Sequence, residues 1–141
     1  MRTLLLSLAL SFVLLGCKDA NPAAASEAAT AATPEITVED ASKALQSGAV
    51  AVDANSASTR EKHGTVPEAV ILTSSSKYEL TQLPDDKSKD LIFYCSNTHC
   101  TASDAAAERA STNGYKNVHV MREGIKGWKD AGNATAPYPQ S

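Results

Sequence analysis

The sequence has few positive charges and no cluster of them. Of its 141 residues, 13 are Lys or Arg and 16 are Asp or Glu, which gives a net charge of −3. Once Arg2 is removed with an export signal, 12 basic residues remain against 16 acidic ones and the net charge is −4. Proteins that bind nucleic acid present a basic face to the phosphates. The composition therefore excludes nucleic acid as an expected partner.

The one long apolar run, at the N-terminus, is too short to span a membrane. In MRTLLLSLALSFVLLGC, Arg2 precedes an apolar stretch from Leu4 to Leu15 that ends at Gly16 and Cys17. A positive charge, a short apolar segment and a small residue in this order are typical of an export signal.

The stretch LLGC at 14–17 resembles the lipobox of bacterial lipoproteins. The resemblance implies that residues 1–16 are a signal peptide and that Cys17 is acylated, which would anchor the protein to a membrane outside the cytoplasm. Lys18, rather than aspartate, after Cys17 favours the periplasmic side of the outer membrane in a two-membrane cell. The alternative is an ordinary cleaved signal with a soluble product.

The segment between Lys18 and Pro34 contains no aromatic and no large aliphatic residue. Such a segment cannot bury enough apolar surface to order itself. We therefore expect a flexible tether over 17–34, a single folded domain over 35–133 and a C-terminal tail over 134–141. The chain length suits one domain.

Apolar runs alternate with amphipathic segments along the folded part. Strands are predicted at 49–54, 69–74, 91–95 and 117–121, and helices at 36–47, 101–114 and 124–132, with a single helical turn at 59–62. Continuous apolar runs indicate strands that are buried on both faces. The pattern predicts an α/β fold in which a central, mostly parallel sheet is flanked by helices on both faces.

The helix at 101–114 has its own predicted start and face. Thr101 is a possible N-cap with Asp104 three residues on, and Gly114 ends the helix. The buried stripe is expected to contain four alanines: Ala102, Ala105, Ala106 and Ala110.

Asp53 and Cys95 both lie where a predicted strand ends, and sites in such sheets form at the carboxyl ends of strands. The loop after Cys95 must turn the chain into the next helix, and a tight turn of this kind points successive N–H groups inward. Together with the helix N-terminus they favour an anion: a thiolate, a persulfide or an oxyanion. The predicted anion-binding loop contains Ser96, Asn97, Thr98, His99 and Cys100.

Six stretches in order resemble a rhodanese-like domain, the fold of sulfurtransferases: AVAVDA, GTVPEAV, IFYC, AAAERA, GYKNVHVM and EGIKGWKDAG. The resemblance implies that Cys95 accepts sulfane sulfur from a small donor such as thiosulfate and passes it to a thiol or cyanide. It implies no cofactor and no metal. Asp53 corresponds to the aspartate of the family's Asp-x-Arg motif, which organises neighbouring loops and is structural support.

The departures from the family pattern are the missing positive charges. The loop has Cys100 where simple counting places the family's arginine, and Asn55 stands at the arginine of Asp-x-Arg, with Arg60 the nearest replacement. Affinity for a dianionic donor is therefore expected to be weak, because charge-assisted hydrogen bonds are the strong ones. Cell-cycle phosphatases of this fold also need a loop arginine to clamp phosphate, so phosphatase activity is disfavoured.

Cys100 raises a second possibility. With Cys17 acylated, Cys95 and Cys100 are the remaining thiols, and the compartment is oxidising. They can form a resting or structural disulfide, or Cys100 can act as a resolving thiol that attacks the sulfur carried by Cys95. The alternatives are therefore an extracytoplasmic thiol redox protein with a partner protein, or an inactive binding or sensing module.

The histidines leave two further readings open. His99 is a candidate to take a proton during transfer, or simply an exposed loop residue. His63, His99 and the two cysteines could supply zinc ligands, but His63 is distant in sequence, so a metal site is disfavoured.

Overall fold

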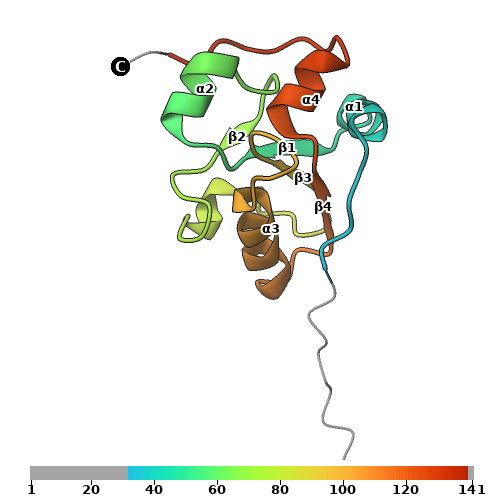
Figure 1. Cartoon of the computed structure of the whole chain (residues 1–141). Helices are drawn as coiled ribbons and strands as arrows, with labels where there is room; N and C mark the ends of the chain where they lie inside the picture. The colour runs from blue at the N-terminus through green and yellow to red at the C-terminus, as the bar shows by residue number, and fades with distance from the viewer. Residues whose placement is uncertain (1–31, 140–141) are drawn as a thin grey trace, which may run out of the picture. The chain divides into compact units, whose positions relative to one another are not determined.

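A sheet of four parallel strands forms the centre of the computed structural model, which describes residues 32–139 (Figure 1). The strands are β1 (Val50–Asp53), β2 (Val70–Ile71), β3 (Asp90–Tyr94) and β4 (Asn117–Met121), in the order β2-β1-β3-β4. Their register places Asp53 beside Tyr94 and Tyr94 beside Met121. The carboxyl ends of β1, β3 and β4 therefore lie level with one another. The predicted α/β fold is confirmed.

Helices cover both faces of this sheet (Figure 1). On one face, α1 (Val38–Gln46) and α4 (Gly124–Asp130) pack against the sheet, and on the other face lie α3 (Ala102–Thr112) and the short 3-10 helix η1 (Leu80–Gln82). Alternation along β3 supplies both cores: Leu91 and Phe93 face α3, whereas Ile92 and Tyr94 face α1 and α4.

The predicted signal peptide at 1–16 and the predicted lipidation site Cys17 lie outside the described residues. So does the predicted tether at 17–34, except for residues 32–34. The end of the tether is held by β4, since Val120 N–H donates to Pro34 O at 2.9 Å and Ile36 N–H donates to Val120 O at 3.0 Å. Within residues 32–139, no helix has the length and apolar character needed to cross a bilayer.

Every predicted element except β4 differs from its expected bounds by one to three residues at one or both ends, and two of these differences have a clear cause. The helix α2 runs from Ala57 to His63, longer than the single turn expected, because Ser56 caps it by accepting from Thr59 N–H at 3.4 Å. The edge strand β2 contains only Val70–Ile71 instead of residues 69–74. Its pairing with β1 ends where Leu72 N–H donates to Asp53 O, and Thr73 is already exposed.

The predicted start and face of α3 are partly wrong. Its buried residues are Ser103, Ala106, Ala107 and Ala110, and Thr101 makes no side-chain capping bond. Asp104 instead accepts two hydrogen bonds of 2.7 Å from the Arg122 guanidinium, which also contacts Glu35. Because alanines occupy several sides of this helix, their spacing alone did not define the side that meets the sheet.

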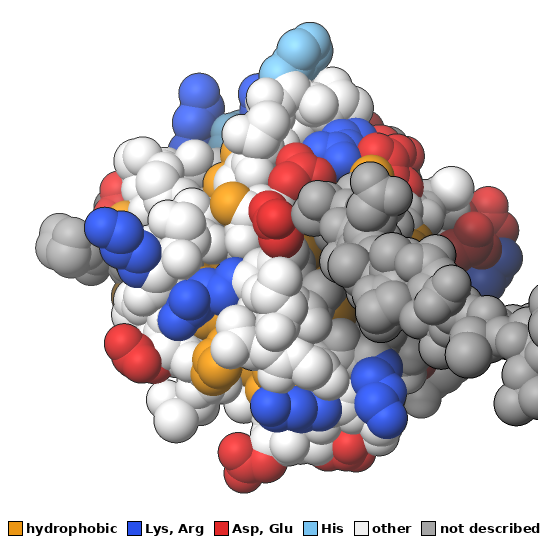
Figure 2. All heavy atoms as spheres, turned by 90° about the horizontal axis from the view of Figure 1, so that it is seen from below, with side chains coloured by type: hydrophobic (Ala, Val, Ile, Leu, Met, Phe, Trp, Pro, Cys, Tyr) orange, Lys and Arg blue, Asp and Glu red, His pale blue; other side chains and the backbone are white. Residues whose placement is uncertain are grey.

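The face seen from below in Figure 2, which includes α3, has charged side chains of both signs interspersed over the part not covered in grey. The visible part of this surface therefore has no large patch of one charge, as expected from the composition.

A buried ion pair ties the strand ends together. Asp53 is fully buried and accepts hydrogen bonds from Arg60 Nε at 3.0 Å, from Tyr94 Oη at 2.6 Å and from Asn55 N–H at 2.7 Å. Tyr94 Oη also accepts from Val66 N–H. Burial, reinforced by the Asp53 charge, raises the pKa of Tyr94, so its hydroxyl stays protonated and donates.

Arg60 extends this network to β2. Arg60 Nη2 donates to the main-chain carbonyl oxygens of Asp53, at 3.3 Å, and of Leu72, at 3.0 Å. The network therefore joins α2 and the ends of β1, β2 and β3, directly before Cys95.

We expect Asp53→Asn to lower the free energy of unfolding by about 3–5 kcal/mol, because it leaves the Arg60 guanidinium buried without a counter-charge. Urea denaturation followed by the fluorescence of Trp128, the single tryptophan, measures this change. The double variant Asp53→Asn with Arg60→Met should recover part of the loss. The exposed control Glu39→Gln should be as stable as the wild type, and an equally stable Asp53→Asn would contradict the role of the pair.

Candidate functional site

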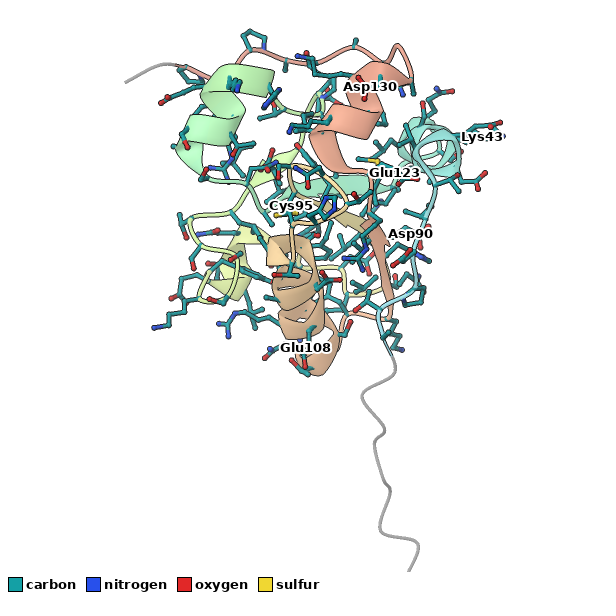
Figure 3. The ribbon with its side chains drawn as sticks, in the orientation of Figure 1. Lys43, Asp90, Cys95, Glu108, Glu123 and Asp130 are labelled. Atoms are coloured by element: carbon teal, nitrogen blue, oxygen red, sulfur yellow. A yellow bond between two sulfur atoms is a disulfide. The ribbon has the colours of Figure 1, made fainter. Side chains whose placement is uncertain are left out.

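Cys95 follows β3 directly at the carboxyl edge of the sheet and is only 1% exposed. Figure 3 shows it between α3 and α4. Its sulfur forms a disulfide with Cys100, and the two Cα atoms are 6.3 Å apart. The structure thus brings together the two thiols that the sequence singled out, in their oxidised form.

Asn97 makes the turn that returns the chain to Cys95. Its carbonyl oxygen accepts from Cys100 N–H at 3.0 Å, and its side-chain Oδ1 accepts from His99 N–H at 2.9 Å. Both hydrogen bonds close short rings within the loop, so residues 97–100 reverse direction and carry Cys100 back over Cys95. The sequence analysis placed Asn97 in the loop without assigning it this role.

The predicted anion-binding loop is only partly available in this form. The N–H groups of His99 and Cys100 bind Asn97, whereas those of Ser96, Asn97 and Thr98 meet no acceptor within residues 32–139. Three main-chain donors therefore remain for an anion.

Among residues 32–139, no guanidinium completes the loop. Arg60 is engaged with Asp53, and Arg122 is engaged with Asp104 and Glu35. The pKa of Arg122 is raised, chiefly by its hydrogen bonds with Asp104. The His99 side chain is exposed and lies 3.3 Å from Thr98 Oγ1, so in this conformation it contacts its neighbour rather than Cys95.

Ser103 is the polar side chain next to the Cys95 sulfur. Its hydroxyl lies 3.5 Å from Cys95 Sγ and is buried in the first turn of α3, and the carbonyl oxygen of Cys100 lies 3.2 Å from the same sulfur. A hydroxyl in this position can donate to a thiolate or a persulfide. Sequence reasoning missed Ser103 as a site residue, because the spacing of the alanines did not define the side of α3 that meets the sheet.

The start of α4 holds the loop from the other side. Ile125 N–H donates to Cys95 O at 2.8 Å, and Lys126 N–H donates to Ser96 O at 3.2 Å. This contact needs Gly124, which has φ +63°, since an added Cβ would lie 2.7 Å from Ser96 C and 2.8 Å from Asn97 N. The glycine was visible in the sequence, but its contact with the loop was not.

A groove of about 460 Å³ runs beside the loop and is lined by Asn97, Thr98, His99, Glu123, Lys126, Gly127 and Asp130. Figure 3 shows Glu123 near the start of α4 and Asp130 toward its other end. The Oε2 atom of Glu123 is buried without a hydrogen-bond partner among the described residues. The groove therefore presents charges of both signs, and Cys95 is not part of its lining.

His63 ends α2 and takes no part in the loop. Burial lowers its pKa, and the charges of Lys129, Lys62 and Lys126 lower it further. Across residues 32–139, no three His, Cys, Asp or Glu side chains are grouped to hold a metal ion.

We expect Gly124→Ala to displace the loop and to speed alkylation of Cys95 in the reduced protein. Gly132→Ala is the matched control, because Gly132 also has a positive φ of +79° but an added Cβ there meets nothing within 4 Å. Both variants bear the left-handed strain of about 1–2 kcal/mol, so only the clash separates them. Mass spectrometry after timed iodoacetamide treatment measures the rate, and equal rates in the two variants would contradict the contact.

Comparisons with known proteins identify the fold and the domain family of this chain. The family pattern of the rhodanese-like domain matches residues 37–131, and no curated protein matches the chain significantly. Among solved structures, a rhodanese-related protein from Thermoplasma volcanium is 20% identical with a TM-score of 0.62, covering 74% of this chain and 99% of its own.

Two further structures are equally distant in sequence. The polysulfide-sulfur transferase homodimer of Wolinella succinogenes is 17% identical, with a TM-score of 0.62 and coverage of 77% of this chain and 81% of its own. A Rhodopseudomonas palustris protein of unknown function, described as a possible tyrosine phosphatase, is 23% identical, with a TM-score of 0.61 and coverage of 76% and 87%. At these identities the structures share the fold, and with the match over residues 37–131 they show that the chain belongs to the rhodanese-like domain family.

Proposed function

We propose that the protein is a sulfurtransferase that carries sulfane sulfur as a persulfide on Cys95 and passes it to a thiol or cyanide acceptor. The observation that supports this most directly is the setting of Cys95. Its sulfur lies at the carboxyl edge of the sheet, 3.5 Å from the Ser103 hydroxyl, at the start of a loop with three uncommitted N–H groups. Such donors stabilise negative sulfur without a metal or a cofactor.

The reaction starts from the reduced protein, because the nucleophile is a thiolate and in the disulfide the two sulfurs are bonded to each other. The Cys95 thiolate attacks the outer sulfur of the donor, the S–S bond of the donor breaks, and the rest of the donor leaves with the electron pair. With thiosulfate the leaving group is sulfite. The Ser103 hydroxyl and the N–H groups of Ser96, Asn97 and Thr98 then bind the persulfide.

The charge of the loop favours donors with a low negative charge. Thiosulfate is a dianion, and both Arg60 and Arg122 are engaged in ion pairs. Main-chain donors alone give weaker binding than charge-assisted hydrogen bonds. A persulfide or a polysulfide monoanion is therefore the better substrate class.

A thiol redox function is the second candidate, and the Cys95–Cys100 disulfide is the observation that favours it. In that function, a partner protein exchanges electrons with the disulfide and no sulfur atom is carried. The two candidates differ in whether sulfur is added to Cys95.

Incubation of the reduced protein with a sulfane donor tests the proposal. We expect mass spectrometry to find one added sulfur atom on the Cys95 peptide of Cys100→Ser, because Cys95 alone forms the persulfide. The variant Cys95→Ser should gain none, although it keeps Cys100. A reversible disulfide in the wild type with no sulfur adduct in Cys100→Ser would favour the redox function instead.

We also propose that Cys17 is acylated and anchors the domain on the periplasmic side of the outer membrane. The support is the LLGC stretch and Lys18, both of which lie outside the described residues. After cell fractionation, the wild type should sediment with outer-membrane vesicles on a density gradient. Cys17→Ser should lose this association, whereas Cys100→Ser should keep it. Equal membrane binding of Cys17→Ser and wild type would contradict acylation.

A further inference from the structure

We infer that Cys100 resolves the persulfide on Cys95, and that the outer sulfur leaves as hydrogen sulfide. This inference rests on the proposed function and names the thiol that discharges Cys95 and the product. The domain then reduces a persulfide or polysulfide, and a dithiol reductant restores its two thiols. Asn97 is the positioning residue for this step.

The geometry of the loop supports Cys100 as the thiol that resolves the persulfide. The disulfide shows that Cys100 Sγ reaches Cys95 Sγ within the folded domain. One end of the loop is fixed by the hydrogen bonds from Ile125 and Lys126 of α4, and the other end continues into α3 after Thr101. A thiol tethered in this way competes well with any thiol in solution, because an intramolecular reaction has a high effective concentration.

Two N–H groups of the loop form the turn and are therefore not available to bind an anion. Asn97 takes up the N–H groups of His99 and Cys100, which the sequence analysis had expected to point at the sulfur. These two bonds are the ones that bring Cys100 back to Cys95. The loop is thus arranged to complete a disulfide as much as to store a persulfide.

External acceptors meet an obstacle at the same place. Cys95 is 1% exposed in the closed loop, and the groove beside the loop is lined by residues 97–99 and α4 without Cys95. In the disulfide form, an external thiol therefore reaches Cys95 only when Cys100 has moved aside. Cys100 itself is tethered next to this sulfur.

The step balances as follows. The neutral persulfide on Cys95 is attacked at its inner sulfur, Sγ, by the Cys100 thiolate. The bond between Sγ and the outer sulfur breaks, and the outer sulfur leaves with the electron pair and its proton as HS⁻. The outer sulfur is reduced by two electrons while the two cysteines are oxidised to the disulfide. A dithiol then reduces the disulfide and becomes oxidised in turn.

A single-turnover experiment tests the inference. The full chain is reduced, freed of reductant and mixed without oxygen with inorganic polysulfide. Released sulfide is trapped with monobromobimane, and the protein is analysed by mass spectrometry. We expect the wild type to end as the Cys95–Cys100 disulfide with no added sulfur. Cys100→Ser should keep one sulfur on Cys95 and release about one equivalent of sulfide less per chain, as the stoichiometry of the step requires.

Asn97→Ala supplies a test that leaves both cysteines in place. It removes the Oδ1 contact to His99 N–H and keeps the main-chain N–H of residue 97, so the disulfide should form several-fold more slowly once Cys95 is loaded. Asn117→Ala is the control, because it removes an exposed side-chain hydrogen bond to Ser88 O at the opposite end of the sheet, and it should close at the wild-type rate. Equal closure rates in both variants would overturn the positioning role of Asn97.

The outcomes separate this inference from the proposed function. If Cys100→Ser and Cys100→Ala load sulfur but the wild type keeps its persulfide and releases no extra sulfide, the inference is wrong and the sulfurtransferase proposal stands. If neither Cys100 variant loads sulfur while circular dichroism shows both to be folded, the proposed function fails and the inference fails with it.

Discussion

The buried pair of Asp53 and Arg60 is the interaction on which the candidate site depends. An unpaired charge at this depth would destabilise the fold strongly, so the two side chains must stay together. Through Tyr94 and the carbonyl of Leu72, the pair holds the ends of β1, β2 and β3 in one arrangement. Cys95 is the residue directly after β3, and its position is therefore set by charge pairing beneath it.

The loop that follows this network contains no arginine or lysine. Its polar groups near Cys95 are main-chain N–H groups and the Ser103 hydroxyl, and Cys100 is bonded to Cys95 in the disulfide. An arginine in such a loop would bind dianions through charge-assisted hydrogen bonds, whereas main-chain donors and a hydroxyl favour ligands with less charge. The same short loop also makes the site sensitive to its redox state, because one disulfide covers the reactive sulfur.

The fold could be predicted from the sequence because apolar runs and helical patterns within short segments indicate the strands and helices. The strand predicted at 117–121 matches β4 residue for residue, and the strand predicted at 91–95 is shifted by one residue from β3. The contact of Gly124 with the loop and the place of Ser103 beside Cys95 were not predictable, since both depend on how α3 and α4 lie across the sheet. Asn97 was missed for a different reason: an asparagine that makes a turn looks like any polar loop residue.

The pairing of residues 34–36 with β4 has a consequence for molecules that are crowded together. A free sheet edge offers unpaired N–H and C=O groups to a neighbouring chain. In the described part of this chain, the incoming segment covers the β4 edge through Val120, and the opposite edge strand, β2, is only two residues long. Closely packed copies would thus have little exposed backbone with which to build a shared sheet.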